Sequence, residues 1–338
     1  IGGYGEGLYS NHSGAGDIAD FLRAVLYFGY KYNKKWLLNT EIEFEHASTG
    51  KEGAVSVEFA YLDYLYRDEL NFRIGLLLIP MGFLNELHEP TVFFSTRRPD
   101  VESKIIPTTW RENGLGFFGN IDSITYRVYV VNGLNARGFS PSGIRGGRQK
   151  GSKAIANELA GVVRVDWRPT TWLMVGGSVY YGDSGQEATL SVPVEMYEAH
   201  VEYRYRGLYI RALSTELNLS KVTLLNRILA TPNDGSPRPD DSQINSIGEK
   251  MMGWYIDIGY DVLTHFDFDE HSLTPYTRVE SYNTQKKTPL GFLGKNNNKV
   301  DVIIIGINFK PMDEIVFKAD YQLYDHLESS SDNQFNLA

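Results

Sequence analysis

Residues 197–205, Tyr197-Glu198-Ala199-His200-Val201-Glu202-Tyr203-Arg204-Tyr205, alternate strictly between two kinds of side chain. The odd positions carry tyrosine, alanine or valine, whereas the even positions carry glutamate, histidine or arginine. Successive side chains of a β-strand point to opposite faces of the sheet. The segment therefore predicts a strand with one face suited to hydrocarbon and the other suited to water.

The same alternation recurs along the chain, for example at residues 36–45 and 315–323, and its connections are alternately short and long. The short connections are residues 33–35, 67–69, 120–123, 168–171, 206–207 and 311–313; the long ones are 11–17, 48–53, 80–111, 133–156, 183–191, 218–247, 285–298 and 326–332. A closed up-and-down barrel in a bilayer has this pattern, because its strands turn tightly on one side and carry longer loops on the other.

Counting the alternating segments gives about 16 strands, a number that encloses an aqueous lumen. The predicted spans are 3–10, 18–32, 35–47, 54–66, 70–79, 112–119, 123–132, 157–168, 171–182, 193–206, 207–217, 247–262, 273–284, 299–310, 313–325 and 333 onward. We predict an all-β fold in which residues 1–338 form one transmembrane antiparallel barrel domain. Since the last segment stops early for a membrane strand, we expect strand residues beyond Ala338.

Aromatic residues gather at the short connections, which favours a membrane barrel over a soluble sandwich with the same alternation. They are Tyr30, Tyr32, Trp36, Tyr64, Tyr66, Trp167, Trp172, Tyr203, Tyr205 and Tyr209. Strand propensity also favours aromatic residues, but it does not explain their concentration at one end. We therefore predict an aromatic girdle at one membrane interface.

The composition narrows the possible functions. The chain of 338 residues has a net charge of -9, which argues against nucleic-acid binding, and it has no cysteine, which excludes thiol chemistry. No run approaches the roughly 20 apolar residues of a membrane helix. No histidine has a partner at zinc-motif spacing, and no glycine-serine-glycine elbow is present, so we predict neither a cofactor nor enzyme activity. An outer-membrane barrel enzyme with serine, histidine and acid at one rim is the alternative.

The third long connection, about residues 80–111, mixes aromatic, proline and charged residues, as a packed functional loop does. The motifs around it are Phe72-Arg73-Ile74-Gly75, Pro80-Met81-Gly82, Glu89-Pro90 and Arg111-Glu112-Asn113-Gly114-Leu115-Gly116. Together they resemble the phosphate-selective porin O and P family, best over residues 55–135. The resemblance implies an outer-membrane porin of a Gram-negative bacterium, a homotrimer, and a third loop that folds into the barrel and narrows the pore.

The resemblance also implies passive diffusion of small hydrophilic solutes with a preference for anions, including phosphate. Strand direction assigns these basic residues to the pore, mostly in its tight-turn half: Arg73, Arg127, Arg164, Arg168, Arg204, Arg206, Arg211, Arg278 and Lys318. Arg97, Arg98, Lys104 and Arg111 would add positive charge at the loop. Arginine suits bidentate contacts with phosphate, and a basic wall concentrates anions. We expect Arg97→Ala or Arg98→Ala to reduce the anion preference.

Acidic residues are assigned to the other half of the pore wall: Glu41, Glu43, Glu45, Glu58, Glu198 and Glu216. Acids and bases that pair across neighbouring strands would satisfy one another instead of acting on solutes, and this interpretation stays open. A non-selective diffusion porin is the alternative function. The predicted partners of the chain are the lipid bilayer and lipopolysaccharide. The basic residues in the connection at 133–156 would attract the anionic lipopolysaccharide.

Overall fold

The computed structural model describes residues 1–13, 16–187, 189–232, 234, 236–266, 270–295, 298–326 and 332–338. Within them the 16 strands are β1 (Gly2–His12), β2 (Ile18–Lys31), β3 (Trp36–Glu45), β4 (Val55–Arg67), β5 (Leu70–Leu78), β6 (Arg111–Ile121), β7 (Ile124–Asn132), β8 (Leu159–Thr170), β9 (Leu173–Asp183), β10 (Pro193–Tyr205), β11 (Leu208–Leu219), β12 (Lys250–Tyr260), β13 (Ser272–Lys287), β14 (Lys299–Met312), β15 (Ile315–His326) and β16 (Asp332–Leu337). Each predicted span overlaps one of these strands.

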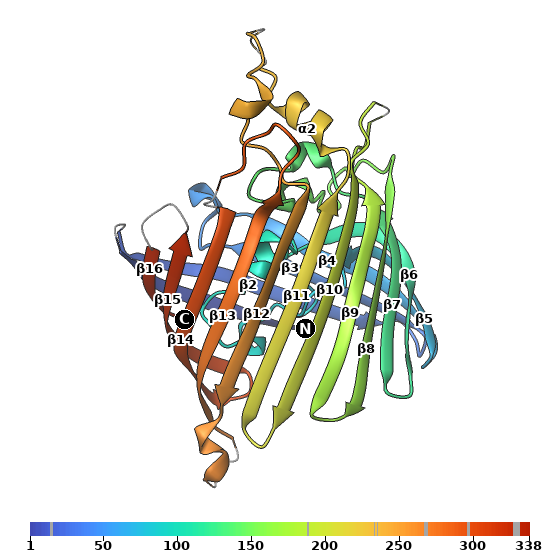
Figure 1. Cartoon of the computed structure of the whole chain (residues 1–338). Coiled ribbons are helices and arrows are strands. Elements are labelled where there is room, and N and C mark those ends of the chain that lie inside the picture. The colour runs from blue at the N-terminus through green and yellow to red at the C-terminus, as the bar shows by residue number, and fades with distance from the viewer. Residues whose placement is uncertain are drawn as a thin grey trace.

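The strands pair antiparallel in chain order and form a closed barrel (Figure 1). Closure comes from β1, which pairs with β2 and also with β16, where Tyr9 stands opposite Leu337. The predicted fold class is therefore confirmed. None of the helices in the described part of the chain is long and apolar enough to cross a membrane.

Tight turns join the strands at one end of the barrel, and long loops join them at the other end, where α2 (Val222–Leu229) lies (Figure 1). Arg206 and Gly207 have φ angles of 48° and 81°, the two positive values that a two-residue type I′ hairpin turn requires. The β12–β13 connection is longer and contains a 3-10 helix, η6 (Val262–His265). The predicted connections at 11–17, 183–191, 218–247, 285–298 and 326–332 lie partly outside the described residues.

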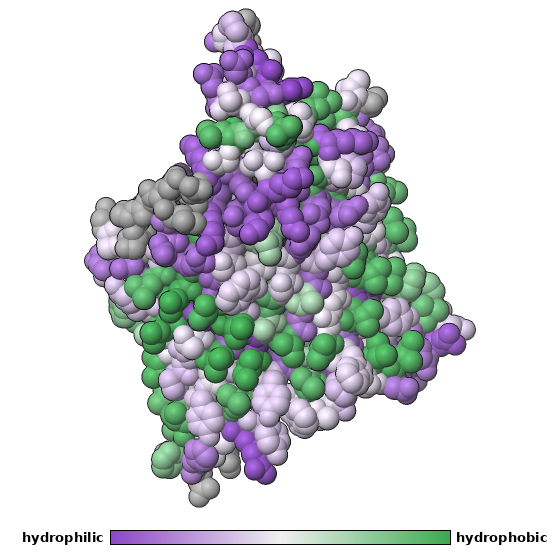
Figure 2. Space-filling view, viewed as in Figure 1, coloured by the Kyte–Doolittle hydropathy of each residue, from purple (hydrophilic) through white to green (hydrophobic). Residues whose placement is uncertain are grey.

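The outward face of the barrel is apolar. Examples of exposed apolar side chains on this face are Ile303 and Ile305 on β14, and Val163 and Val165 on β8. Figure 2 shows hydrophobic side chains gathered over the strands and hydrophilic ones over the long loops. Such a band suits contact with lipid acyl chains.

Exposed aromatic side chains lie at the tight-turn ends of the strands, as the sequence predicts. Trp36 packs on Tyr64 with ring centroids 4.8 Å apart, and Trp172 packs on Tyr203 at 5.5 Å. The prediction is wrong for Tyr209, which shares the inward face of β11 with Arg211 and packs on Phe94 at 4.7 Å. The hairpin register decides this, because Tyr209 stands opposite the inward residue Arg204, so the odd positions of β11 face inward.

The interior differs between the two halves of the barrel. In the half next to the long loops, the inner face of β7 to β14 is largely apolar and belongs to a hydrophobic core, which includes Val162, Tyr180 and Val302. On β8 in this half, apolar residues occupy both faces, Val162 inside and Val163 outside, so alternation alone did not predict the core. Charged side chains line the interior mainly in the tight-turn half and along β1 to β4.

Candidate functional site

Residues 79–110, between β5 and β6, form a segment that includes η2 (Pro90–Val92) and α1 (Val101–Lys104). Asn85 joins the two ends of this segment. Its amide donates hydrogen bonds to the carbonyl oxygens of Ile79, at 2.6 Å, and Trp110, at 2.8 Å, and its side-chain oxygen accepts from the Trp110 N–H at 2.6 Å. The start and end of the segment are therefore held together beside the wall from which they emerge.

The far part of the segment is bound to strands on the other side of the ring. Asp320 on β15 accepts a hydrogen bond from the Thr96 N–H at 2.7 Å, and Lys318 donates one to the Ser95 carbonyl at 2.9 Å. Glu280 on β13 accepts from the backbone N–H of residue 101. Because β13 stands eight strands from β5 in a ring of 16, these contacts join opposite parts of the wall.

Glu102, fully buried on α1, fixes the fold of the segment itself. One carboxylate oxygen accepts from the Leu84 N–H at 2.7 Å, and the other accepts from the Tyr255 hydroxyl of β12 at 2.6 Å. Burial raises the pKa of this carboxyl above its ordinary value, and the two hydrogen bonds oppose that rise. The carboxylate thus ties two arms of the segment to the barrel wall.

A cavity of about 850 Å³ lies in the tight-turn half of the barrel. Six arginines line it: Arg73, Arg127, Arg164, Arg168, Arg204 and Arg211. They come from β5, β7, β8, β10 and β11, because alternate residues of adjacent antiparallel strands share a face. All six belong to the basic residues that strand direction assigned to the pore, so the structure brings these together.

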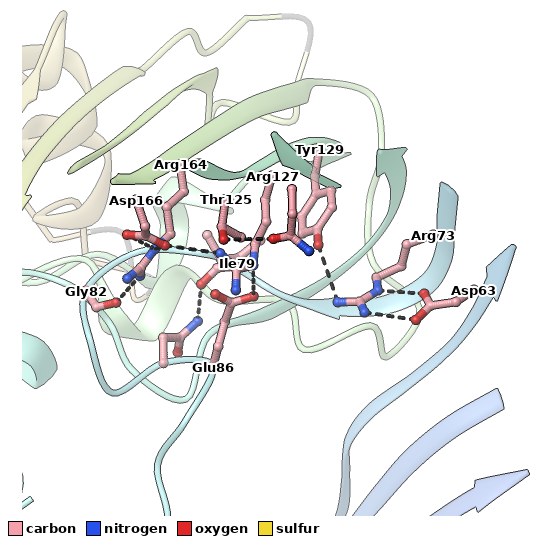
Figure 3. A network of polar contacts seen from close by, with 12 residues as sticks. Asp63, Arg73, Ile79, Gly82, Glu86, Thr125, Arg127, Tyr129, Arg164 and Asp166 are labelled. Carbon is pink, nitrogen blue, oxygen red and sulfur yellow. Dashed lines mark hydrogen bonds and ion pairs between the residues drawn. The ribbon is translucent and has the colours of Figure 1, made fainter. Parts of the chain in front are cut away.

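Most of these arginines are neutralised by carboxylates, as Figure 3 shows for the network around Arg164. Arg73 lies 2.7 Å from Asp63, and Arg164 lies 2.9 Å from Asp166. Arg127 lies 3.1 Å from Glu86 of the 79–110 segment. Pairing across neighbouring strands, which the sequence left open, is seen for Arg73 with Asp63 and for Arg127 with Asp166 at 3.3 Å, whereas Arg164 pairs within its own strand.

Two of these arginines, at the tight-turn side of the cavity, have the most exposed side chains. Arg168 is exposed and forms no ion pair with any of the described residues. The Arg204 side chain is 57% exposed, although it lies 3.1 Å from Glu202, which Arg211 also approaches at 2.8 Å. Of the six arginines, these two are exposed.

The other basic candidates lie away from this cavity. Arg278 is fully buried 2.6 Å from Asp257, Arg111 is buried 2.8 Å from Glu58, and the Lys318 ammonium lies 3.7 Å above the Phe93 ring. Each of these three basic groups is buried against a partner within the chain.

The basic residues of the 79–110 segment are dispersed. Arg97 and Lys104 are exposed, and Arg97 bonds to Ser10 at 3.3 Å. Arg98 donates to the His88 carbonyl at 3.2 Å. Burial and the nearby Arg23 charge lower the pKa of Arg98 to about 10.

The acidic candidates lie in different surroundings. Glu41 lies 3.3 Å from His88, Glu43 lies 2.8 Å from Arg23, and Glu58 pairs with Arg111. Glu45 is exposed at the end of β3.

One acidic assignment is wrong: Glu216 lies on the outward face of β11, 2.7 Å from Lys250. The inward positions of β11 are the odd ones, such as Arg211 and Thr215, so an even position faces outward. Among the described residues, no cluster of histidine and acidic side chains is arranged to hold a metal ion.

Sequence reasoning missed Glu6, Glu86, Asp166 and Asp257, which neutralise the arginines. All except Glu86 share the alternating face of their strand with another inward polar residue, so parity could have identified them. The buried trio Ser178, Glu198 and His200 is not arranged for nucleophilic catalysis. The serine hydroxyl donates to Glu198 at 2.7 Å instead of to the histidine, which binds the other oxygen of the same carboxylate.

Comparison with known proteins identifies a relative and several structures with the same fold. An uncharacterized protein of Aquifex aeolicus (strain VF5) is 36% identical over 350 residues, covering 100% of this chain and 78% of the relative. No protein-family model matches the chain, so the resemblance to the phosphate-selective porins stays a prediction.

Three solved structures are similar over nearly the whole chain. OmpF of Salmonella typhi in complex with daunomycin has a TM-score of 0.63 at 11% identity and covers 98% of this chain and 94% of its own. The outer membrane channel DcaP of Acinetobacter baumannii has a TM-score of 0.61 at 13% identity and covers 99% of this chain and 94% of its own. The trimer form of OmpT, an outer membrane protein of Vibrio cholerae, has a TM-score of 0.53 at 12% identity and covers 98% of this chain and 95% of its own. At these identities the similarity establishes the fold.

Proposed function

The chain belongs to the same family as the uncharacterized Aquifex aeolicus protein, and we propose that it is an outer-membrane porin of a Gram-negative bacterium. It would conduct small hydrophilic solutes by passive diffusion. The observation that carries this proposal is a closed barrel of 16 strands with an apolar outer face and an arginine-lined interior cavity of about 850 Å³. An apolar exterior suits lipid, whereas a charged interior suits water and ions.

In this proposal, the 79–110 segment is the inward-folded loop that narrows the pore. Contacts with strands on opposite sides of the ring support this role, because a segment that starts at β5 and binds β13 and β15 has its shortest course across the lumen. The apolar core around the segment supports it further, since this core fills part of the lumen. In this proposal the loop is a constriction whose position is fixed by these contacts.

The anion preference is the finer part of the proposal. It is supported by the exposed guanidinium groups of Arg168 and Arg204, which face the cavity without full neutralisation. Positive charge in a cavity with low-dielectric walls raises the local concentration of anions. Arginine suits bidentate contacts with phosphate, and the exposed side chains of Arg168 and Arg204 are available for such contacts.

The test is a reversal-potential measurement on the purified protein in a planar bilayer under a salt gradient. We expect conduction with an anion preference, and we expect the double variant Arg168→Gln/Arg204→Gln to shift the reversal potential toward cations. Arg67→Gln is the matched control, because Arg67 is an arginine at another tight turn that does not line the cavity. Replacing chloride by phosphate measures the selectivity between anions.

Each part of the proposal has an outcome that contradicts it. Absence of conductance in the folded protein would reject the porin. A reversal potential of zero would leave a non-selective diffusion porin, and strict cation preference would reject the anion preference. A homotrimer is proposed as well, supported by the trimer form of the similar OmpT structure. Chemical cross-linking in detergent followed by size analysis tests it.

A further inference from the structure

The two sides of the 79–110 segment meet very different surroundings. On one side, Met81, Val101, Ile105 and Ile106 are fully buried in the hydrophobic core, together with inward residues of β7 to β14. Loop residues such as Leu134 extend this core toward the long-loop end. Apolar packing of this kind excludes water, because an ion there would lose its hydration without gaining polar partners.

On the other side, the segment faces charged residues of β1, β2 and β3. Glu6 lies on β1, Arg23 on β2, and Glu41 and Glu43 on β3. From the segment, the His88 imidazole approaches Glu41 at 3.3 Å. The Arg98 guanidinium also interacts electrostatically with Glu43 and Arg23 on this side. Polar and charged groups of the segment therefore face charged groups of β1 to β3.

Two cavities border this charged side. The arginine-lined cavity includes Tyr27, Glu41 and Glu89 in its lining, and a second cavity of about 640 Å³ shares these three residues and adds Tyr4 and Glu6. Within the described part of the chain, the buried Nδ1 of His88 has no hydrogen-bond partner. A buried polar atom without a protein partner is a place for water.

Arg23 stands across this side between two carboxylates. Its guanidinium lies 2.9 Å from Glu6 and 2.8 Å from Glu43, and both acids are buried. The bridge joins side chains of β1, β2 and β3. Removing the arginine would leave two carboxylates without this partner, whereas removing Glu43 would leave part of the guanidinium charge unpaired.

We infer that the permeation route passes along the β1 to β3 side of the 79–110 segment, and that Arg23, bridging Glu6 and Glu43, is its specificity-determining restriction. The inference rests on the proposed porin function. The β7 to β14 side of the segment is packed largely with the hydrophobic core, whereas the β1 to β3 side has charged walls and adjoining cavities. The charge at this restriction then acts on every ion that crosses.

The test uses the natural absence of cysteine, which makes single cysteines unique reporters. Tyr4→Cys and Glu43→Cys place a thiol on the proposed route, and Thr215→Cys places one on the inward face of β11, beside the hydrophobic core. A positively charged methanethiosulfonate reagent is added to channels in a planar bilayer. We expect loss of most of the current at positions 4 and 43 and no loss at position 215.

Charge variants give a second, independent readout. Arg23→Gln is expected to raise the conductance and to shift the reversal potential toward cations, and Glu43→Gln is expected to shift it toward anions. Glu216→Gln is the matched control, because this glutamate lies on the outward face and pairs with Lys250. The Tyr4→Cys channel keeps the test decisive if a charge variant does not fold.

The outcomes separate this inference from the proposed function. A folded wild-type protein that does not conduct would reject the porin itself. Conducting channels that are blocked at position 215 and not at positions 4 and 43 would reject the route and leave the porin intact. Unchanged selectivity in both charge variants would reject Arg23 as the restriction.

Discussion

Asp320 is the main anchor for the far part of the 79–110 segment, so its removal should release that part. Its two oxygens accept from the Thr96 N–H at 2.7 Å, the Thr96 hydroxyl at 2.9 Å, the Tyr276 hydroxyl at 3.0 Å and the side-chain amides of Gln322 and Asn336, each at 3.0 Å. The hydroxyls can rotate to other acceptors. In Asp320→Ala, the Thr96 N–H and at least one amide lose their acceptor.

The expected magnitude follows from these lost bonds. A buried donor without an acceptor costs about 1–3 kcal/mol, so two of them give about 3 kcal/mol if water relieves part of the loss. Since every 1.4 kcal/mol is tenfold, the released state should become roughly 100-fold more populated. The barrel itself should stay folded, because its strand pairing does not depend on Asp320.

A buried reporter on the segment measures this release. Ser95 is fully buried next to Thr96, so Ser95→Cys reacts with a small thiol reagent only when the segment opens. The labelling rate of Ser95→Cys should rise roughly 100-fold in the Asp320→Ala background when opening is fast and reversible. Asp301→Asn is the control, because Asp301 lies on the outward face of neighbouring β14. An unchanged labelling rate in a folded Asp320→Ala barrel would refute the anchor and leave the apolar core as the fixing element.

Three further predictions concern the interior. Asp257→Asn breaks the buried ion pair with Arg278 and should lower the free energy of unfolding by about 3–5 kcal/mol, measured by denaturant unfolding in detergent micelles. Trp110→Ala removes a fully buried ring that packs 4.7 Å from Tyr180, and should cost about 3–5 kcal/mol, seen as a lower temperature for loss of the folded band on gels. Burial raises the pKa of Glu102, so its stabilising contribution is full below the ordinary glutamate pKa and falls as pH rises through the raised value. Glu102→Gln should flatten this decline in a melting-temperature series, whereas an equally steep decline would contradict it.

Much of the barrel could be predicted from local pattern. Alternation identified the strands and their facing side chains because the period of two is a property of the backbone. Residues 315–323 show this clearly, since the even positions Lys318, Asp320 and Gln322 all face inward as expected. Glu216 is the exception, because it stands at an even position of β11, whereas inward residues of this strand such as Arg211 stand at odd positions.

The candidate site was less predictable, because pairing depends on distance between strands. The sequence selects Arg73, Arg164 and Arg278 as equivalent inward cations, yet Arg278 lies apart from the cavity in a fully buried ion pair. The carboxylates that neutralise the arginines come from other positions on the same or neighbouring strands, or from the loop. Alternation gives the face of a residue and not its height relative to a neighbour, so it cannot match charges.

The sequence by itself determined the strand count, the two faces of each strand and the two ends of the barrel, because these follow from local periodicity and turn length. Only the tertiary structure decided where the 79–110 segment binds, which arginines keep a free charge and which side of the segment is polar. Those features depend on contacts such as Thr96 with Asp320, which join residues 224 positions apart in the chain. No local pattern encodes such contacts, since they arise when ring closure brings β15 and the loop after β5 together.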